Sequence, residues 1–108
     1  MELKLDDART MIQKVLKVFE SESGIELVVL DEETIHFEFG WVFFYQSKEF
    51  VETSNPDFLL GGNVPIIVDK YLRDMYEVGT RRGIKYYQER YEKNRDVISE
   101  FRQLQSFL

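Results

Sequence analysis

Residues 34–47 read TIHFEFGWVFFYQS, and this stretch decides how the chain folds. Its odd-numbered positions are all large and apolar: Ile35, Phe37, Phe39, Trp41, Phe43 and Tyr45. Most even-numbered positions are polar or small, which is the alternation of a β-strand with one buried face. A helix would scatter the odd positions around its circumference, because it turns once every 3.6 residues or so, that is about 100° per residue. The pattern predicts one long strand that carries the core.

Gly40 stands in the middle of this stretch, immediately before the only tryptophan of the chain. A glycine inside a strand often marks a bulge or the close approach of another backbone. A bulge here would exchange the two faces of the strand beyond Gly40. We expect Trp41 and Phe43 to hold the fold. A role in binding falls instead on the even face, at Phe44, and on the segment that follows.

The residues before the stretch predict a helix and a short strand. Apolar residues recur at helical spacing over residues 6–22, at Ala8, Met11, Ile12, Val15, Leu16 and Phe19. We expect Asp6 to cap this helix and Gly24 to end it. Residues 25–30 predict a strand that forms a hairpin with residues 34–47 through the acidic turn at 31–33.

The residues after the stretch predict an irregular segment, two strands and a helix. Residues 54–57 carry a strong turn signal, SNPD. The neighbouring apolar residues either tuck under the sheet or form an exposed apolar surface, and they are Phe50, Val51, Phe58, Leu59 and Leu60. Residues 64–70 and 75–80 predict paired strands, with Pro65 near the start of the first. Residues 84–107 predict one long helix whose far end packs on the first helix, packs on a second copy, or frays.

This order of elements predicts an α+β fold in a single domain that spans residues 1–108. We expect a four-stranded antiparallel sheet with the N-terminal and the long C-terminal helix on one face. The chain has 14 Lys and Arg against 20 Asp and Glu, a formal charge of −6. That charge disfavours nucleic acid and membrane surfaces as partners and favours a basic protein.

Composition also limits the chemistry and the location. The chain has no cysteine, so it has no disulfide or thiolate metal site. The charged N-terminus lacks the apolar core of a signal peptide, and no apolar run is long enough to span a bilayer. We expect a cytoplasmic protein, either a monomer or a homodimer.

The residues suited to catalysis form no recognisable constellation. His36 and Glu38 would point the same way from a strand, but two such ligands make a weak metal site. Carboxylates gather around the irregular segment without the spacing of an acid–base pair, at Glu49, Glu52, Asp57 and Asp69. The glycines at 61–62 precede a strand and lack the features of a phosphate-binding loop. We expect no cofactor and no enzymatic activity, with an enzyme built on these groups as the alternative.

Three blocks of sequence carry a family resemblance: GWVFFYQSKEFVET at 40–53, GNVPIIVDK at 62–70, and VGT at 78–80. In their order and spacing they resemble the YrhB-like family of bacterial immunity proteins, the Immunity protein 35 domain family. The positions that match are Gly40, Trp41, Phe43, Glu49, Glu52, Thr53, Gly62, Asn63, Pro65, Asp69, Lys70, Gly79, Thr80 and Tyr87. Arg73 departs from the pattern at a glycine position. We expect either that the turn is built differently or that a non-glycine residue takes a positive φ.

The resemblance implies a small α+β domain encoded beside a toxin that it neutralises by binding. Papain-like toxin domains are the associated class, and the family is also linked to a heat-induced, chaperone-like role. Family motif and aromatic enrichment at interfaces together suggest a set of partner contacts. They are Phe44, Glu49, Phe50, Glu52, Thr53, Asp57, Phe58, Gly62 and Asn63. The other motif positions are expected to maintain the fold, namely Gly40, Trp41, Phe43, Pro65, Asp69, Lys70, Gly79 and Thr80.

Overall fold

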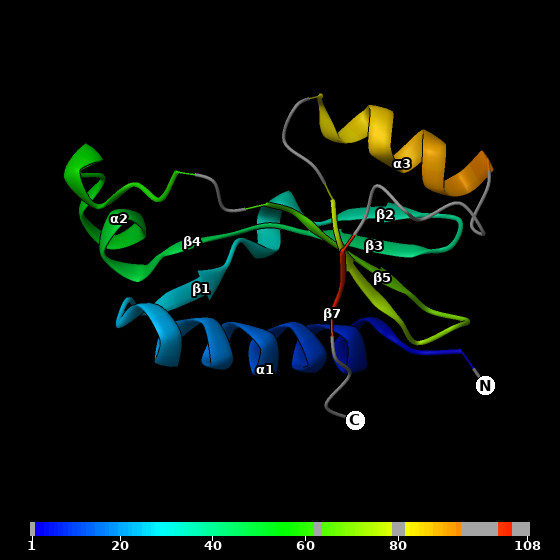
Figure 1. Cartoon of the computed structure of the whole chain (residues 1–108), viewed down its shortest axis with the longest axis horizontal. Coiled ribbons are helices and arrows are strands. Elements are labelled where there is room, and N and C mark those ends of the chain that lie inside the picture. The colour runs from blue at the N-terminus through cyan, green and yellow to red at the C-terminus, as the bar shows by residue number, and fades with distance from the viewer. Residues whose placement is uncertain (1, 62–63, 79–81, 94–101, 105–108) are drawn as a thin grey trace.

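The computed structural model describes residues 2–61, 64–78, 82–93 and 102–104. Within these residues three helices accompany the sheets (Figure 1): α1 Leu5–Ser23, α2 Lys48–Thr53 and α3 Ile84–Lys93. The strands are β1 Leu27–Val29, β2 Ile35–Phe37, β3 Gly40–Phe43, β4 Tyr45–Ser47, β5 Ile66–Asp69, β6 Met75–Glu77 and β7 Arg102–Leu104. Two 3₁₀ turns lie at Asp31–Glu33 and Pro56–Phe58. The predicted α+β class and N-terminal helix are confirmed.

The strands form two antiparallel sheets rather than the single four-stranded sheet that we predicted. One sheet has five strands in the order β2-β3-β5-β6-β7, and the other pairs β1 with β4. In Figure 1, α1 and α3 lie on opposite sides of the larger sheet. The prediction that both helices cover one face is therefore wrong. The reason is that β3 and β5 are buried on both faces, so each face needs its own cover.

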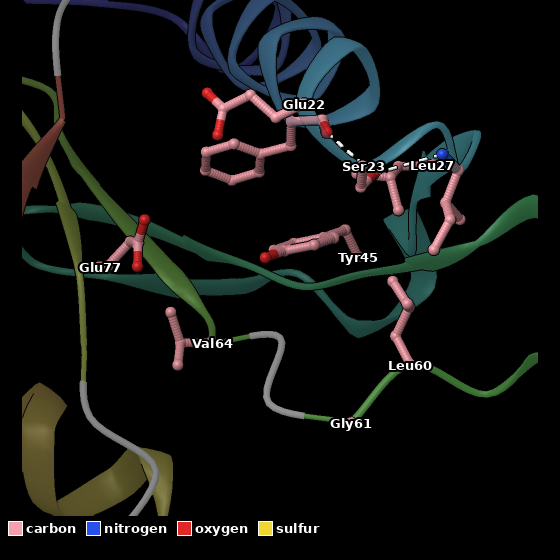
Figure 2. A pocket seen from close by; sticks show the side chains of 10 residues that line it. Glu22, Ser23, Leu27, Tyr45, Leu60, Gly61, Val64 and Glu77 are labelled. Atoms are coloured by element: carbon pink, nitrogen blue, oxygen red, sulfur yellow. Dashed lines mark hydrogen bonds between the residues drawn. The ribbon is translucent and has the colours of Figure 1, made fainter.

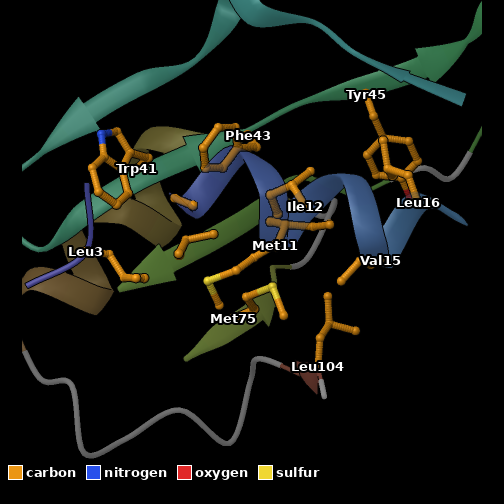
Figure 3. Close-up of a cluster of buried hydrophobic side chains, with 13 residues drawn as sticks. Leu3, Met11, Ile12, Val15, Leu16, Trp41, Phe43, Tyr45, Met75 and Leu104 are labelled. Carbon is orange, nitrogen blue, oxygen red and sulfur yellow. The ribbon is translucent and has the colours of Figure 1, made fainter. Parts of the chain in front are cut away.

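Two hydrophobic clusters fill the two sides of this sheet. The α1-side cluster (Figure 3) consists of Leu3, Ala8, Met11, Ile12, Val15, Leu16, Trp41, Phe43, Tyr45, Ile66, Val68, Met75 and Leu104. The α3-side cluster consists of Val42, Ile67, Tyr76, Val78, Tyr87 and Tyr91, with six more apolar residues packed against it, among them Ile35, Phe37, Phe39 and Phe44. Trp41 and Phe43 are thus core residues, as predicted.

The stretch 34–47 forms a hairpin followed by β4, and not one long strand. The chain turns at residues 38–39, so that Ile35 lies opposite Val42 and Phe37 lies opposite Gly40. Cross-strand partners share a face. The odd-numbered residues before the turn therefore pack on the α3 side, whereas those after the turn pack on the α1 side. The faces do exchange at Gly40, but a hairpin turn causes the exchange and not a bulge.

At Gly40 the backbone of β3 comes close to the backbone of β5, as the glycine in the middle of the stretch predicted. Its φ is 146°, and a Cβ added there would lie 2.0 Å from the carbonyl oxygen of Val68 on β5. Only glycine fits this position, because both the backbone angle and the distance exclude a side chain.

The ends of α1 and the C-terminal part of the chain test three more predictions. Gly24 ends α1 in the left-handed conformation, as predicted, while Lys4 rather than Asp6 occupies the N-cap position. The predicted helix over 84–107 is wrong: α3 ends at Lys93, and β7 pairs with β6. Strand pairing and the burial of Leu104 in the α1-side cluster outweigh the local helical pattern there.

The turn between β5 and β6 is organised by Asp69, which is fully buried. Its Oδ1 accepts hydrogen bonds from the amides of Tyr71 and Leu72 at 2.8 and 2.9 Å. Its Oδ2 accepts one from the Tyr91 hydroxyl of α3 at 2.7 Å. Arg73 follows with a φ of 62°, so a non-glycine residue does take the positive φ. The structural role predicted for Asp69 has a clear physical basis here.

Of the four other motif residues, two have backbone roles and two lie outside the described part. The Pro65 carbonyl accepts a hydrogen bond from the Val78 amide at 3.1 Å. The Lys70 amide donates to the Phe39 carbonyl at 2.8 Å, which ties the β5–β6 turn to the β2–β3 turn. Gly79 and Thr80 lie outside the described residues.

Candidate protein-binding surface

Two buried polar side chains hold the segment that follows β4. Gln46 and Ser47 are 7% and 3% exposed. The Gln46 Oε1 accepts from the amides of Ser47 and Leu60, at 2.9 and 2.7 Å. The Ser47 hydroxyl accepts from the Phe50 amide at 3.0 Å, which caps α2, and donates to the Phe58 carbonyl at 2.6 Å. The position of residues 48–60 therefore depends on these two residues.

Ser47→Ala should lower the free energy of unfolding by about 1–2 kcal/mol, because it removes a helix cap and a second hydrogen bond. Hydrogen exchange of the Phe50 amide should accelerate at the same time. Thr53→Ala is the matched control, since the Thr53 hydroxyl is exposed and bonds only within the segment, to the Glu49 carbonyl and the Asn55 amide. An equal loss in both variants would contradict the anchoring role of Ser47.

The apolar residues of this segment divide between the interior and the surface. Phe50 and Leu60 are half-buried, while Val51, Phe58 and Leu59 are 47%, 42% and 52% exposed. The sequence left open whether these residues tuck under the sheet or form an exposed apolar surface. Phe50 and Leu60 are partly covered, whereas the other three are exposed. The exposed three, with Ile25 at 40%, place apolar side chains around one end of the molecule.

A groove of about 650 Å³ lies at this end, between the turn after α1 and the segment after β4. We call its lining the α2-end surface: Gly24, Ile25, Glu26, Ser47, Lys48, Glu49, Glu52, Asp57, Phe58, Leu59 and Leu60. Lys48 pairs with Glu26 at 3.5 Å and with Glu52 at 3.9 Å. Four carboxylates against one ammonium give the lining a net charge of −3.

The structure gathers four predicted contact residues on the α2-end surface, namely Glu49, Glu52, Asp57 and Phe58. Thr53 and Phe50 belong to α2 but do not line the groove. Phe44 packs on the α3-side cluster, away from the other predicted contacts. Gly62 and Asn63 lie outside the described residues.

Sequence reasoning missed Ile25 and Glu26 as members of this surface. They were assigned to a strand, whereas β1 begins at Leu27 and the preceding residues form the exposed turn after α1. The Lys48 amide bonds the Glu26 carbonyl at 2.9 Å, which brings the two segments together. No local pattern reveals this contact, because it follows from the pairing of β1 with β4.

A second cavity of about 350 Å³ adjoins the groove and shares Ile25 and Leu60 with it. Figure 2 shows the Tyr45 ring and the Glu77 carboxylate among the side chains that line it. Phe19 packs against Tyr45 with a centroid distance of 6.1 Å. Burial, with a smaller effect of the Glu77 charge, raises the pKa of Tyr45.

The other titratable groups offer no reactive arrangement in the described part of the chain. His36 and Glu38 are both exposed, and no group of three His, Asp or Glu there could hold a metal. A hydrogen bond from Arg9 lowers the pKa of Asp31, and one from the Leu27 amide lowers the pKa of Glu20. These shifts stabilise the charged forms of the two carboxylates. A carboxyl group that transfers protons near neutral pH needs a raised pKa instead.

Comparison with known proteins supports the family resemblance. Residues 6–94 match the family model for Immunity protein 35. "Uncharacterized protein YrhB" of Escherichia coli K12 is 36% identical over 61 residues. That match covers 55% of this chain and 65% of YrhB, so the chain spans less than two thirds of this relative. No solved structure matches the chain. No helix among the described residues is long and apolar enough to cross a membrane. The match over most of its length shows that this chain belongs to the Immunity protein 35 family.

Proposed function

We propose that this protein is a non-catalytic immunity protein that binds and neutralises a cognate bacterial toxin through the α2-end surface. Family membership supports a protein partner. The single observation that carries the choice of surface is the groove itself, where exposed Phe58 and Leu59 lie among four carboxylates.

The composition of this surface suits protein recognition. Apolar side chains at the centre of an interface supply most of the binding energy when the partner covers them. Charged side chains around them act mainly on the association rate and on the choice of partner. A lining charge of −3 on a chain of charge −6 favours a toxin with a basic surface. Papain-like toxin domains, the class that the family resemblance suggests, are the first targets to test for occlusion of the active-site cleft.

The test uses the toxin encoded beside this gene, with affinity measured by calorimetry and toxin activity measured in parallel. Replacing Phe58 and Leu59 together by alanine should weaken binding about 100-fold, as expected for two central contacts. Tyr71 and Leu72 provide a matched control, because they are equally exposed apolar neighbours on the β5–β6 turn. Their double alanine variant should stay within about threefold of the wild type.

Charge reversal tests the proposed role of the carboxylates. The Glu49→Lys, Glu52→Lys variant should slow association about tenfold at low salt, with less effect at high salt. Absence of binding to any neighbouring gene product would contradict the proposed function. Equal losses in the Phe58–Leu59 and Tyr71–Leu72 variants would contradict the proposed surface alone.

The exposed apolar residues also favour a second candidate function, a chaperone-like binder of unfolded proteins. Such a binder should suppress the heat-induced aggregation of unrelated clients such as citrate synthase. Val51→Ser, Phe58→Ser and Leu59→Ser together should abolish that effect. A dedicated immunity protein should leave the aggregation of these clients unchanged while it still neutralises its toxin.

A further inference from the structure

The cavity that adjoins the α2-end surface extends from it along the ring of Tyr45. We call it the Tyr45 cavity. Its volume is about 350 Å³, and it shares Ile25 and Leu60 with the groove. In Figure 2, Tyr45 lies between Leu60 and the Glu77 carboxylate. The cavity therefore runs from an apolar end, beside the groove, to an end that carries a carboxylate.

Most of the wall of the Tyr45 cavity is apolar. The Phe19 and Tyr45 rings pack together in this wall, with a centroid distance of 6.1 Å and an angle of 44° between their planes. Six of the ten lining residues are apolar or aromatic: Phe19, Ile25, Leu27, Tyr45, Leu60 and Val64. Such a wall can cover the methylene groups of a long side chain, and an aromatic face also attracts a cation.

The charged residues of the lining are both acidic. Glu22 and Glu77 line the cavity, and its lining includes no Lys or Arg. Glu22 is exposed, and its carboxylate forms no ion pair or hydrogen bond within the part of the chain that the structure describes. A partner that brings a positive charge gains an ion pair at Glu22. An apolar partner side chain would instead take water from this carboxylate without replacing it.

The adjoining groove has the same sign once its ion pairs are counted. Lys48 is the one basic residue in the described lining of the groove, and it is already engaged in two ion pairs. The side chains of Glu49 and Asp57 form no ion pair or hydrogen bond with any described residue. Together with Glu22, they give the groove and the cavity three carboxylates that only a partner can neutralise.

We propose that the Tyr45 cavity receives one arginine side chain of the toxin. The methylene stem of that arginine lies on the aromatic wall, and its guanidinium group reaches Glu22. Arginine suits this site better than lysine, because a planar guanidinium both stacks on an aromatic ring and forms two parallel hydrogen bonds with a carboxylate. The site rests on the toxin-binding function proposed above, to which it adds the chemistry of one central contact.

The first test uses N-acetyl-arginine methylamide as the probe, titrated into the full chain and followed by NMR. The amides of Ile25 and Leu27 and the ring of Tyr45 should shift, with a Kd of about 1 mM for a ligand of this size. The citrulline derivative has the same shape without the charge, so it should bind about tenfold more weakly. The lysine and leucine derivatives should also bind more weakly than the arginine derivative.

Two variants test the residues that hold the arginine. Glu22→Gln should weaken binding of the probe about fivefold at low salt, with less effect at high salt. Glu89→Gln on α3 is the matched control, because it removes the same charge from another exposed glutamate and should have no effect. Phe19→Leu keeps an apolar wall but removes the aromatic face, so it should weaken binding about threefold.

The second test uses the toxin itself. Replacing the inserted arginine of the toxin by alanine should weaken the complex about 30-fold, as expected for an arginine at the centre of an interface. Glu22→Gln should then add little to that loss, because both changes remove the same contact. Strict additivity of the two changes would contradict the pairing of this arginine with Glu22.

The outcomes separate this inference from the proposed function. Equal binding of the arginine, citrulline and leucine derivatives would overturn the inference, as would equal effects of Glu22→Gln and Glu89→Gln. If the Phe58–Leu59 variant weakens toxin binding while Glu22→Gln does not, the proposed function stands and the arginine site fails. If no toxin binds but the probe follows the expected order, the toxin-binding function fails and the cavity remains a guanidinium site.

Discussion

Gly40→Ala should lower the free energy of unfolding by about 4 kcal/mol, which combines backbone strain with a disrupted strand pair. The added Cβ would lie 2.0 Å from the Val68 carbonyl oxygen and 3.1 Å from the Lys70 amide nitrogen. Both are backbone atoms, so no side-chain rotation relieves the contact. To make room, β3 must move away from β5, and the pairing of Gly40 with Asp69 is lost. Urea denaturation followed by tryptophan fluorescence measures the effect, because Trp41 lies beside the site.

Gly83→Ala is the matched control for this variant. A Cβ there would meet nothing within 4 Å, and its φ lies outside the range that excludes side chains. Its stability should stay within about 0.5 kcal/mol of the wild type. A loss of less than 1 kcal/mol or so in Gly40→Ala would contradict the close approach of β3 and β5, since strain at such a position is of order 1–3 kcal/mol by itself.

Asp69→Ala should cost about 4 kcal/mol, because hydrogen bonds to a charged group contribute roughly 1.5–3 kcal/mol each. The change leaves the amides of Tyr71 and Leu72 and the hydroxyl of Tyr91 without their acceptor. Tyr91 is 1% exposed and its ring also contacts Phe37, Phe39 and Tyr76. Loss of the carboxylate should therefore loosen α3 as well as the β5–β6 turn, which hydrogen exchange can resolve.

Asp69→Asn separates the two roles of this carboxylate. The amide keeps one oxygen acceptor for the turn at nearly constant volume, so the loss should be about half that of alanine. Tyr91→Phe should cost about 2 kcal/mol by removing one charged hydrogen bond. In a double-mutant cycle, Asp69→Asn and Tyr91→Phe should be non-additive, because they share the 2.7 Å bond. Strict additivity would contradict the link between the turn and α3.

Local sequence patterns predicted the elements in which apolar residues recur over many positions, and those that end at a glycine or a turn motif. The apolar stripe of α1 and its Gly24 stop are visible in the sequence, as are β5, β6 and the turn at 54–57. The hairpin inside residues 34–47 was missed because both of its strands have alternating apolar residues in phase with each other. Reversal at the turn moves these residues to opposite faces, and a linear pattern cannot show that.

The two-sided sheet and β7 were missed for a related reason. Burial of both faces of β3 and β5 is a property of the assembled sheet, and it decides that α1 and α3 lie on opposite sides. β7 has the apolar spacing of a helix in its sequence, yet pairing with β6 gives it a strand conformation. Nonlocal pairing outweighs weak local preference at such a position.

The candidate site was predicted in part. Glu49 and Glu52 match the family motif, Asp57 and Phe58 were predicted from the irregular segment beside them, and all four residues line one groove. Phe44 was included because it is an aromatic residue on an even position, but the exchange of faces turns it toward α3. Ile25 and Glu26 lie beside the groove because β1 pairs with β4. The paired residues are about 20 positions apart, so no local sequence pattern predicts this contact.

The attachment of residues 48–60 through Gln46 and Ser47 has a consequence for how this scaffold can diversify. The anchors bond backbone atoms of the segment, at Phe50, Phe58 and Leu60, and not its exposed side chains. Exposed positions such as 49, 51, 52, 57 and 59 can therefore be randomised together while the segment keeps its path. The residues that hold the segment and the residues that it exposes can therefore be mutated separately, as in an antibody variable domain. One stable fold can in this way be adapted to different protein partners by exchange of a short surface segment.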